Sequence, residues 1–299
     1  MKILLLGANG QVGFALHRSL VAHGGVVPTT RSGKLPGSNA ACETADLDRP
    51  DSLAGLVMRI SPDIVINAAA YTAVDKAESE PEAAHRANAE SVGALARACA
   101  SRGIPLVHYS TDYVFPGDSS RPWREDDPTA PLGVYGASKL AGEEAIRDSG
   151  CRHLIFRTAW VYGARGHNFL RSMLRLGAER DELRVVADQV GSPTPAAWIA
   201  QATALALARL GEQSGTWNLV AGGETSWHGF AEAIFEAAVQ SGLLERAPST
   251  QPISSAEYPT PARRPAYSRL DTSKLERDSG IQLPDWREGL LQVVGELAG

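Results

Sequence analysis

Tyr135 and Lys139 carry the clearest acid–base chemistry in this chain. They stand four residues apart, so on a helix both side chains lie on one face and point into the same cleft. A free tyrosine has a pKa of about 10 and is a poor proton donor near neutral pH. An ammonium about 4 Å away lowers that pKa by up to about 3 before burial opposes it. The spacing therefore predicts a proton donor tuned by a lysine, or else an exposed helical pair without a role.

A glycine turn at the N-terminus predicts a nucleotide site. Residues 2–6 form an apolar run typical of a buried parallel strand, and three glycines spaced Gly-x-x-Gly-x-x-Gly lead from it into a helical pattern. Glycines let the backbone approach a pyrophosphate, and a helix N-terminus favours its negative charge. The alternative is an ordinary tight turn between strand and helix. The cofactor contacts expected here are Gly7, Gly10, Gln11, Val12 and Gly13.

The second strand, at residues 25–30, indicates which nicotinamide cofactor to expect. It ends without the Asp or Glu that usually holds the ribose hydroxyls of NAD, and Arg31 stands there instead. Because an arginine can hold a 2′-phosphate, we expect NADPH, with NADH possible, unless Arg31 is only a solvated loop charge. Further expected cofactor contacts are Asp46 and Leu47, which follow a loop and could meet the adenine, and Ala69 and Ala70, which follow the next buried strand and leave room for the cofactor.

Strand and helix patterns alternate through the first half of the chain. This alternation predicts an α/β fold, a Rossmann-type doubly wound parallel sheet with a smaller interleaved substrate-binding lobe. We place the dinucleotide-binding domain at residues 1–165, with segment 196–220 returning to it, and the substrate lobe mainly at 166–299. Residues 105–114 read as one strand. The proline-rich stretch 248–265 reads as irregular, either a binding loop or a plain connection.

Composition excludes several classes of function. The 299 residues carry a net charge of −5, with no basic tract and no apolar run of membrane-spanning length, so we expect neither a nucleic acid nor a membrane as partner. The chain starts directly with a core strand, from which we expect no signal peptide and a cytoplasmic location. Cys42, Cys99 and Cys151 are widely spaced and read as inert thiols. His108 lies inside a strand and reads as a core histidine rather than a base.

The chain resembles the extended short-chain dehydrogenase/reductase family over nearly its whole length. The motifs that carry the resemblance lie at residues 7–13, 67–78, 110–117, 135–139, 157–163 and 258–262. Within the family it is similar to reductases of nucleotide-linked deoxysugars. The resemblance implies NADPH-dependent reduction of the C4 ketone of dTDP-4-dehydro-β-L-rhamnose to dTDP-β-L-rhamnose. It also implies a role in carbohydrate biosynthesis, with lipopolysaccharide O-antigen as one destination of the rhamnose.

The resemblance further implies roles for individual residues. Tyr135 would give its proton to the C4 oxygen, Lys139 would hold the nicotinamide ribose and lower the pKa of Tyr135, and Thr111 would hydrogen-bond the substrate oxygen. Further implied cofactor contacts are Ala70, Tyr71 and Thr72, beside Tyr135 and Lys139 themselves. Implied substrate contacts are Thr72, Val74, Thr111, Asp112, Tyr135 and Trp160. For Trp160, packing in the core of a strand is the alternative.

One departure from the family concerns metal binding. Some members bind Mg²⁺ at a dimer contact through three glutamates, and the matching positions here are Ala15, Ala197 and Glu296. Because a hard cation needs several oxygen ligands, we expect no Mg²⁺ at that contact and no other metal site. We expect either a monomer or a homodimer.

Two other functions remain open. The first is another nucleotide-sugar enzyme of the same family, an epimerase or dehydratase that retains NAD. No glutamate stands beside Asp112, which weighs against a dehydratase. The second is a regulatory subunit of methionine adenosyltransferase. The intact set of Thr111, Tyr135 and Lys139 favours catalysis over that role.

Overall fold

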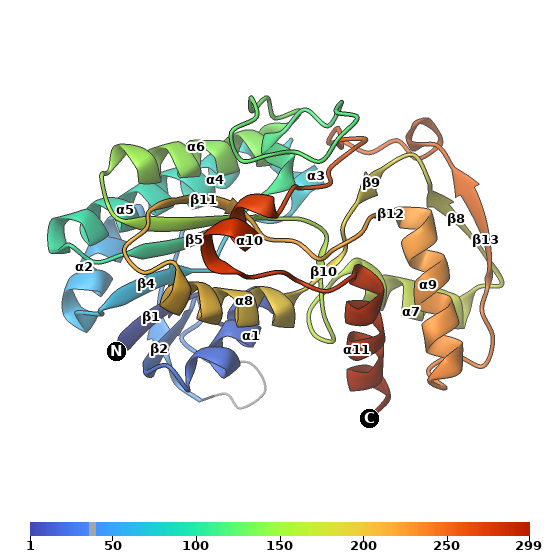
Figure 1. The fold of residues 1–299 in the computed structure, drawn as a ribbon, viewed down its shortest axis with the longest axis horizontal. Coiled ribbons are helices and arrows are strands. Elements are labelled where there is room, and N and C mark those ends of the chain that lie inside the picture. Colours follow the sequence, from blue (N-terminus) through green and yellow to red (C-terminus); the bar gives the residue numbers. More distant parts are fainter. Residues whose placement is uncertain (36–39) are drawn as a thin grey trace.

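The centre of the molecule is a parallel sheet of seven strands in the order β11-β6-β5-β4-β1-β2-β3 (Figure 1). The computed structural model describes residues 1–35 and 40–299. The predicted doubly wound α/β fold is confirmed. Chain order reverses at β1, which pairs with β2 on one side and β4 on the other. The strands are β1 Lys2–Leu6, β2 Gly25–Thr30, β3 Glu43–Thr44, β4 Ile64–Asn67, β5 Leu106–Thr111, β6 His153–Thr158 and β11 Gly215–Asn218.

Two helical layers cover the sheet because its strands are apolar on both faces. Along β1, Ile3 and Leu5 pack in the cluster that contains α1 and α8. Leu4 and Leu6 point the other way, into the cluster with α2, α5 and α6, and all four leucine and isoleucine side chains are fully buried. The helices of these layers are α1 Gln11–Leu20, α2 Pro50–Ile60, α4 Pro81–His85, α5 Ser91–Arg102, α6 Val134–Asp148 and α8 Ala196–Arg209.

Late segments of the chain return to the sheet. Strand β11 is an edge strand beside β6, and α8 packs against α1. Helix α10, Ser273–Ser279, lies against the same edge, where the indole of Trp217 donates to Asp278 at 2.9 Å. The division of the chain into domains at residues 165 and 166 stays a prediction.

The remaining elements form a smaller lobe beside the carboxyl ends of the strands (Figure 1). Its core gathers the aromatic residues Tyr162, Phe230, Phe235 and Trp286. Among the described residues, no helix is both long and apolar enough to cross a membrane. The lobe contains β7 Val161–Tyr162, α7 Phe169–Glu179, β8 Glu182–Val186, β9 Val190–Gly191, β10 Thr194–Pro195, β12 Thr225–Ser226, α9 Trp227–Gln240, β13 Ser249–Ile253 and α11 Trp286–Ala298.

Two expectations about secondary structure were wrong. The stretch 248–265 is not irregular throughout, because β13 pairs in parallel with β8 over its whole length. The pairing partner lies far away in sequence, and Pro252 is tolerated because β13 is an edge strand. The strand expected at 105–114 ends at Thr111, and Asp112–Val114 is a 3₁₀ turn in which the Thr111 hydroxyl accepts from the amide of Tyr113 at 3.2 Å.

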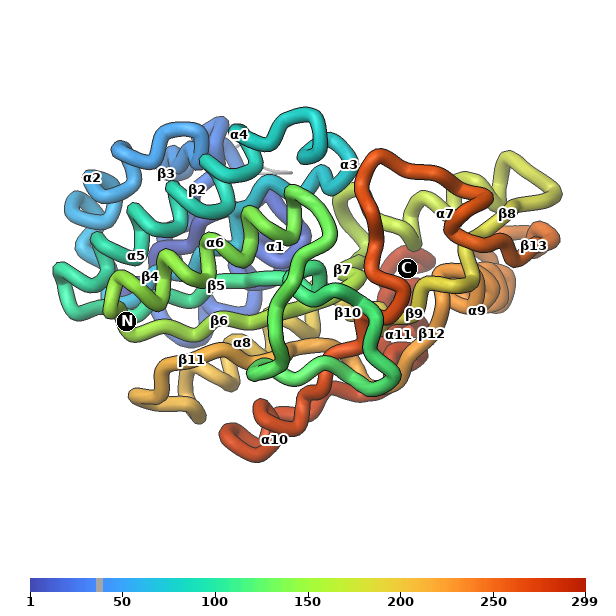
Figure 2. The backbone as a smooth tube through the Cα atoms, turned by 90° about the horizontal axis from the view of Figure 1, so that it is seen from above, coloured from blue at the N-terminus to red at the C-terminus, as the bar shows by residue number. Residues whose placement is uncertain are grey.

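Loops from both halves of the chain meet between the lobes. Residues near Trp123 run beside those near Leu270, and Figure 2 shows these green and red-orange segments side by side. The amide of Trp123 donates to the carbonyl of Arg269 at 2.9 Å. These contacts place the segment at residues 269–270 next to the loop that follows β5.

Candidate active site

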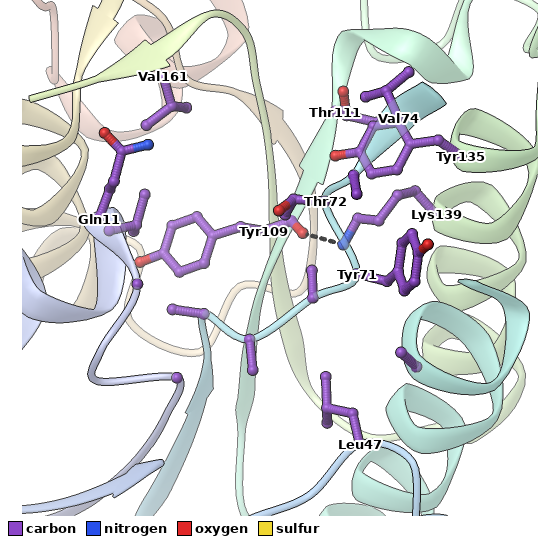
Figure 3. A pocket seen from close by; sticks show the side chains of 18 of the residues that line it. Gln11, Leu47, Tyr71, Thr72, Val74, Tyr109, Thr111, Tyr135, Lys139 and Val161 are labelled. Carbon is purple, nitrogen blue, oxygen red and sulfur yellow. Dashed lines mark hydrogen bonds between the residues drawn. The ribbon is translucent and has the colours of Figure 1, made fainter. Parts of the chain in front are cut away.

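A cavity of about 1030 Å³ lies at the carboxyl ends of β1, β4, β5 and β6. This is the place where ligands bind in open parallel sheets, beside the strand at which chain order reverses. It runs from the glycine turn to the end of β6 (Figure 3). The expected site residues that line it are Gly7, Gly10, Gln11, Val12, Arg31, Asp46, Leu47, Ala69, Ala70, Tyr71, Thr72, Val74, Thr111, Asp112, Tyr135, Lys139 and Trp160.

The glycine turn has the shape that a pyrophosphate needs. Gly7 has a φ of +77°, and a Cβ there would lie 2.7 Å from the amide nitrogen of Ala69. The residue before helix α1 is Gly10, which has no side chain to cap the helix. The first backbone N–H groups of α1 therefore face the cavity without a side-chain acceptor. Gln11 is held from the smaller lobe, because Asn168 donates to its side-chain oxygen at 2.8 Å. The turn fits a dinucleotide.

Gly13 is the one expected cofactor contact that does not line the cavity. A Cβ at this position would lie 2.0 Å from the carbonyl oxygen of Gly7. Because Gly13 has no side chain, α1 can approach the turn closely. The spacing of the glycines predicts the turn correctly. For the third glycine it predicts a cofactor contact, whereas in the structure Gly13 packs the helix against the turn.

The far end of the cavity offers a mixed set of charges. Arg31 follows β2 and lies 3.7 Å from the carboxylate of Asp48, with its side chain mostly exposed. Asp46 and Leu47 line the same end, and the Leu47 carbonyl accepts from Ser91 at 2.6 Å. An exposed guanidinium beside this loop can turn toward a phosphate on the ribose.

Asn88 supports the cavity wall without lining it, and sequence reasoning missed this contribution. It lies in a π-helical turn, Arg86–Glu90, between α4 and α5, and it is fully buried. Its side-chain oxygen accepts from the amide of Tyr71 at 2.9 Å, and its nitrogen donates to the Tyr71 carbonyl and to Ser138, each at 3.0 Å. Asn88 thus ties the loop at Tyr71 to α6. The phenol of Tyr71 donates to Glu80, which also lines the cavity, at 2.9 Å.

Tyr135 projects from the first turn of α6 toward the end of β5 (Figure 3). Its ring packs edge-on against Tyr113, with centroids 5.6 Å apart. Burial raises the pKa of Tyr135 to about 12, the charge of Asp112 adds to the rise, and Thr111 opposes it. The Thr111 hydroxyl donates to Asp112 at 2.9 Å. Burial also raises the pKa of Asp112 to about 6, against hydrogen bonds from Thr111 and Ser268.

The expected lowering of the Tyr135 pKa by Lys139 was wrong for this structure. Lys139 is buried, and its Nζ donates to the carbonyl oxygen of Tyr109 at 2.6 Å and lies 3.0 Å from Nε2 of His108. Burial lowers the pKa of Lys139 itself to about 8, with Glu143 opposing the fall. Spacing places the two side chains on one face of a helix, but desolvation decides both pKa values.

Trp160 has a strained backbone at the cavity wall. Its φ of 48° is in the left-handed region, which a bulky residue rarely adopts. The indole stacks on Trp227 of α9, with ring centroids 3.5 Å apart and planes 5° from parallel. A Cβ on Gly191 would lie 2.6 Å from this indole. The packing supports the strained conformation and leaves Trp160 on the wall between the two lobes.

The three positions matched to the family's Mg²⁺ ligands lie on α1, α8 and α11. Ala15 and Ala197 have no oxygen in their side chains, and Glu296 accepts from Gln292 of the same helix at 3.2 Å. In residues 1–35 and 40–299, no three His, Cys, Asp or Glu side chains come together as a metal site. That this contact binds no Mg²⁺ stays a prediction.

Similarity to known proteins extends over the whole chain. The model of the RmlD substrate binding domain family matches residues 1–298. A dTDP-4-dehydrorhamnose reductase from Burkholderia thailandensis is 50% identical over 306 residues, covering 99% of each chain. The enzyme of the same name from Escherichia coli strain K12 is 46% identical over 300 residues, which cover 99% of this chain and 98% of the relative.

Solved structures agree with these relatives. A dTDP-4-dehydrorhamnose reductase from Clostridium acetobutylicum superposes with a TM-score of 0.90 at 34% identity, covering 100% of both chains. One from Bacillus anthracis, solved in complex with NADP, has a TM-score of 0.87 at 35% identity over 99% of both chains. The chain belongs to the RmlD substrate binding domain family, together with these dTDP-4-dehydrorhamnose reductases.

Proposed function

We propose that this chain reduces the C4 ketone of dTDP-4-dehydro-β-L-rhamnose to dTDP-β-L-rhamnose with NADPH. The observation that carries the proposal is one continuous cavity. It has an uncapped helix N-terminus behind a glycine turn at one end and the Tyr135 phenol with Thr111 at the other. The relatives named dTDP-4-dehydrorhamnose reductase and the NADP complex of the Bacillus anthracis protein support the substrate and the cofactor.

A bound NADPH would supply the hydride for C4. The residues of the chain would position the cofactor and the sugar and would supply the proton for the C4 oxygen. Gly7, Gly10 and the first turn of α1 would hold the pyrophosphate, and Lys139 the nicotinamide ribose. Tyr135 would donate its proton to the C4 oxygen as the ketone is reduced. Its pKa of about 12 keeps the phenol protonated at neutral pH, which is the state a donor needs. The Thr111 hydroxyl, which donates to Asp112 in this structure, would turn its proton toward that oxygen.

The sugar would lie between Tyr135 and the smaller lobe. Thr72 and Val74 line the cavity at the start of α3, Val74–Ala77, and Trp160 lines it on the other side. The apolar side chains of Val74 and Trp160 would exclude water and help to position the ketone next to a bound nicotinamide. We propose these three residues, with Thr111 and Asp112, as the contacts of the deoxysugar.

A direct assay tests the function. When dTDP-4-dehydro-β-L-rhamnose is added to the purified protein and NADPH, the NADPH absorbance should fall. The product should be dTDP-β-L-rhamnose. Absence of turnover under conditions where a relative of established activity works would overturn the proposal. A protein that purifies with NAD and interconverts sugars without added NADPH would be an epimerase or dehydratase. Stable co-purification with methionine adenosyltransferase, without turnover, would indicate a regulatory subunit.

We predict that Arg31→Ala weakens the preference for NADPH over NADH. The side chain is exposed beside the adenosine end of the cavity, where it can pair with the 2′-phosphate. A charge-assisted hydrogen bond of this kind corresponds to about a tenfold change in KM or more. The KM for NADPH should rise by that factor, while the KM for NADH stays the same.

Arg59→Ala is the matched control for this prediction. Arg59 lies in α2, is exposed and pairs with Glu43 of the edge strand β3 at 2.7 Å, and it does not line the cavity. Both KM values should stay unchanged in this variant. An unaltered ratio of the two KM values in Arg31→Ala would show that Arg31 is a solvated charge without a role.

Three further properties complete the proposal. We propose that the protein works in the cytoplasm, as a monomer or a homodimer, and without Mg²⁺ at the contact where some relatives bind it. The alanines at positions 15 and 197 support the absence of this metal. Turnover that is unaffected by EDTA, and a mass in solution that does not depend on Mg²⁺, are the expected results.

A further inference from the structure

His108 lies in the sheet, directly beneath Lys139 of α6. It is in the middle of β5, completely buried, with its Nε2 3.0 Å from Nζ of Lys139. On the neighbouring strand β4, Asn67 is its register partner, and the Asn67 side-chain nitrogen lies 3.2 Å from Nδ1 of His108. A row of three buried polar side chains therefore runs from β4 through β5 to α6.

The orientation of the Asn67 amide is determined by its other neighbour. The side-chain oxygen of Asn67 accepts from the backbone amide of Ala69 at 3.1 Å. A backbone N–H can only donate, so the oxygen must face Ala69 and the NH₂ group must face His108. Nδ1 of His108 then accepts this hydrogen bond, and a neutral imidazole must carry its proton on Nε2.

That proton points at Lys139. An ammonium has three N–H donors and no lone pair, so it would meet the Nε2–H head-on at 3.0 Å. A neutral amine has a lone pair that can accept from Nε2–H while one of its own N–H groups donates to the Tyr109 carbonyl at 2.6 Å. The arrangement of Asn67 and His108 thus matches the neutral form of Lys139.

We propose that Asn67 and His108 are positioning residues that hold the Lys139 amine at the base of the cavity and weaken its affinity for a proton. This role goes beyond the core packing expected for His108. Protonation of Lys139 then requires His108 to move its proton to Nδ1 and to lose the bond from Asn67. The relevance to turnover rests on the proposed reductase function, but the charge state of Lys139 does not.

The other groups around Lys139 act in both directions. Burial lowers the pKa of Lys139, whereas Glu143, one turn further along α6, raises it. Burial and the charge of Lys139 hold the pKa of His108 well below its ordinary value, so the imidazole is neutral. Tyr135, with its raised pKa, is neutral as well at physiological pH. The lowered pKa of Lys139 and the hydrogen-bond geometry act in the same direction, because both disfavour the ammonium relative to an exposed lysine.

Two substitutions test the proposal from different sides. In His108→Gln, the amide can turn its oxygen toward Lys139 and accept from an ammonium. In Asn67→Asp, a carboxylate faces Nδ1, draws the imidazole proton to that atom and leaves Nε2 as an acceptor. Each change should raise the midpoint at which Lys139 loses its proton by about one pH unit. His153→Gln is the matched control, because His153 lies on the adjacent strand β6 outside the cavity and should leave the midpoint unchanged.

The measurement is an NMR titration of protein labelled at the lysine Cε carbon. The chain has five lysines, and Lys139→Met identifies the Lys139 signal by its loss. Nitrogen-15 spectra of the histidines should show His108 as the Nε2–H tautomer. The upward shift in either variant supports the proposal, and either variant decides if the other does not fold.

An Nδ1–H tautomer in the unaltered protein, or a folded variant whose Lys139 midpoint equals that of the unaltered protein, overturns the proposal. Activity gives a second readout. The basic limb of the pH–rate profile should move upward with the Lys139 midpoint, because the ammonium is lost as pH rises. If the unaltered protein shows no turnover, the reductase assignment fails, while the titration still decides the role of Asn67 and His108.

Discussion

Replacing Tyr135 by phenylalanine should lower kcat for reduction of dTDP-4-dehydro-β-L-rhamnose by roughly 10³-fold. The change removes only the phenol oxygen, which is the proposed proton donor. The ring would keep its edge-on contact with Tyr113, so the site should retain its shape. The Kd for NADPH, measured by calorimetry, should therefore stay close to that of the unaltered protein. Steady-state kinetics with saturating cofactor measure the loss in kcat.

Tyr113→Phe is the matched control for Tyr135. It removes the same atom from a neighbouring ring on the same cavity wall, where no proton transfer is proposed. Its kcat should fall by less than about tenfold. Equal losses of kcat in the two variants would mean that turnover depends on any hydroxyl on this cavity wall, and not on Tyr135 in particular. Near-normal activity of Tyr135→Phe would remove Tyr135 from its role as proton donor.

The parallel sheet could be predicted because its causes are local. Apolar runs such as residues 2–6, the glycine turn after them and the alternating helices are visible within short windows of sequence. Strand β13 could not be predicted in this way. Its proline-rich and threonine-rich stretch becomes a strand only because β8 lies beside it, and that pairing is a tertiary contact.

The candidate site shows the same division. Tyr135, Lys139 and Thr111 were predicted because short motifs contain them, and all three line the cavity. The contacts that Asn88 and His108 make behind the cavity were missed, although His108 is the buried core histidine that was expected. Their partners lie 50 and 31 residues away, at Ser138 and Lys139. The tuning of Lys139 was also out of reach, since burial is a property of the folded surroundings.

Glu143→Gln should reduce the free energy of unfolding by about 3–5 kcal/mol. Glu143 is fully buried one turn beyond Lys139 on α6, and both of its oxygens accept from Arg157 of β6, at 2.9 and 2.7 Å. Arg157 is also buried, and it donates to the carbonyl of Glu125 at 3.0 Å. Without the carboxylate, the guanidinium keeps its charge in the interior with no opposite charge beside it.

Urea unfolding measures this loss, and Glu144→Gln provides the control. Glu144 is the next residue on α6 and is exposed, so its substitution should change the unfolding free energy by less than about 1 kcal/mol. A loss in Glu143→Gln no larger than that in Glu144→Gln would contradict the prediction. The double variant Glu143→Leu with Arg157→Met should recover most of the stability, because it buries apolar groups in place of both charges.

The pH dependence of this loss follows from the direction of the Glu143 pKa. Burial opposes ionisation, but the hydrogen bonds and charge of Arg157 outweigh it and hold the pKa of Glu143 below its ordinary value. A carboxylate with a lowered folded-state pKa contributes stability above its unfolded pKa and loses it as pH falls through the folded pKa. The stability difference between the unaltered protein and Glu143→Gln should therefore be full near neutral pH and shrink on acidification. A difference that is constant from neutral to acidic pH would mean that lost packing, rather than the ion pair between α6 and β6, accounts for the effect.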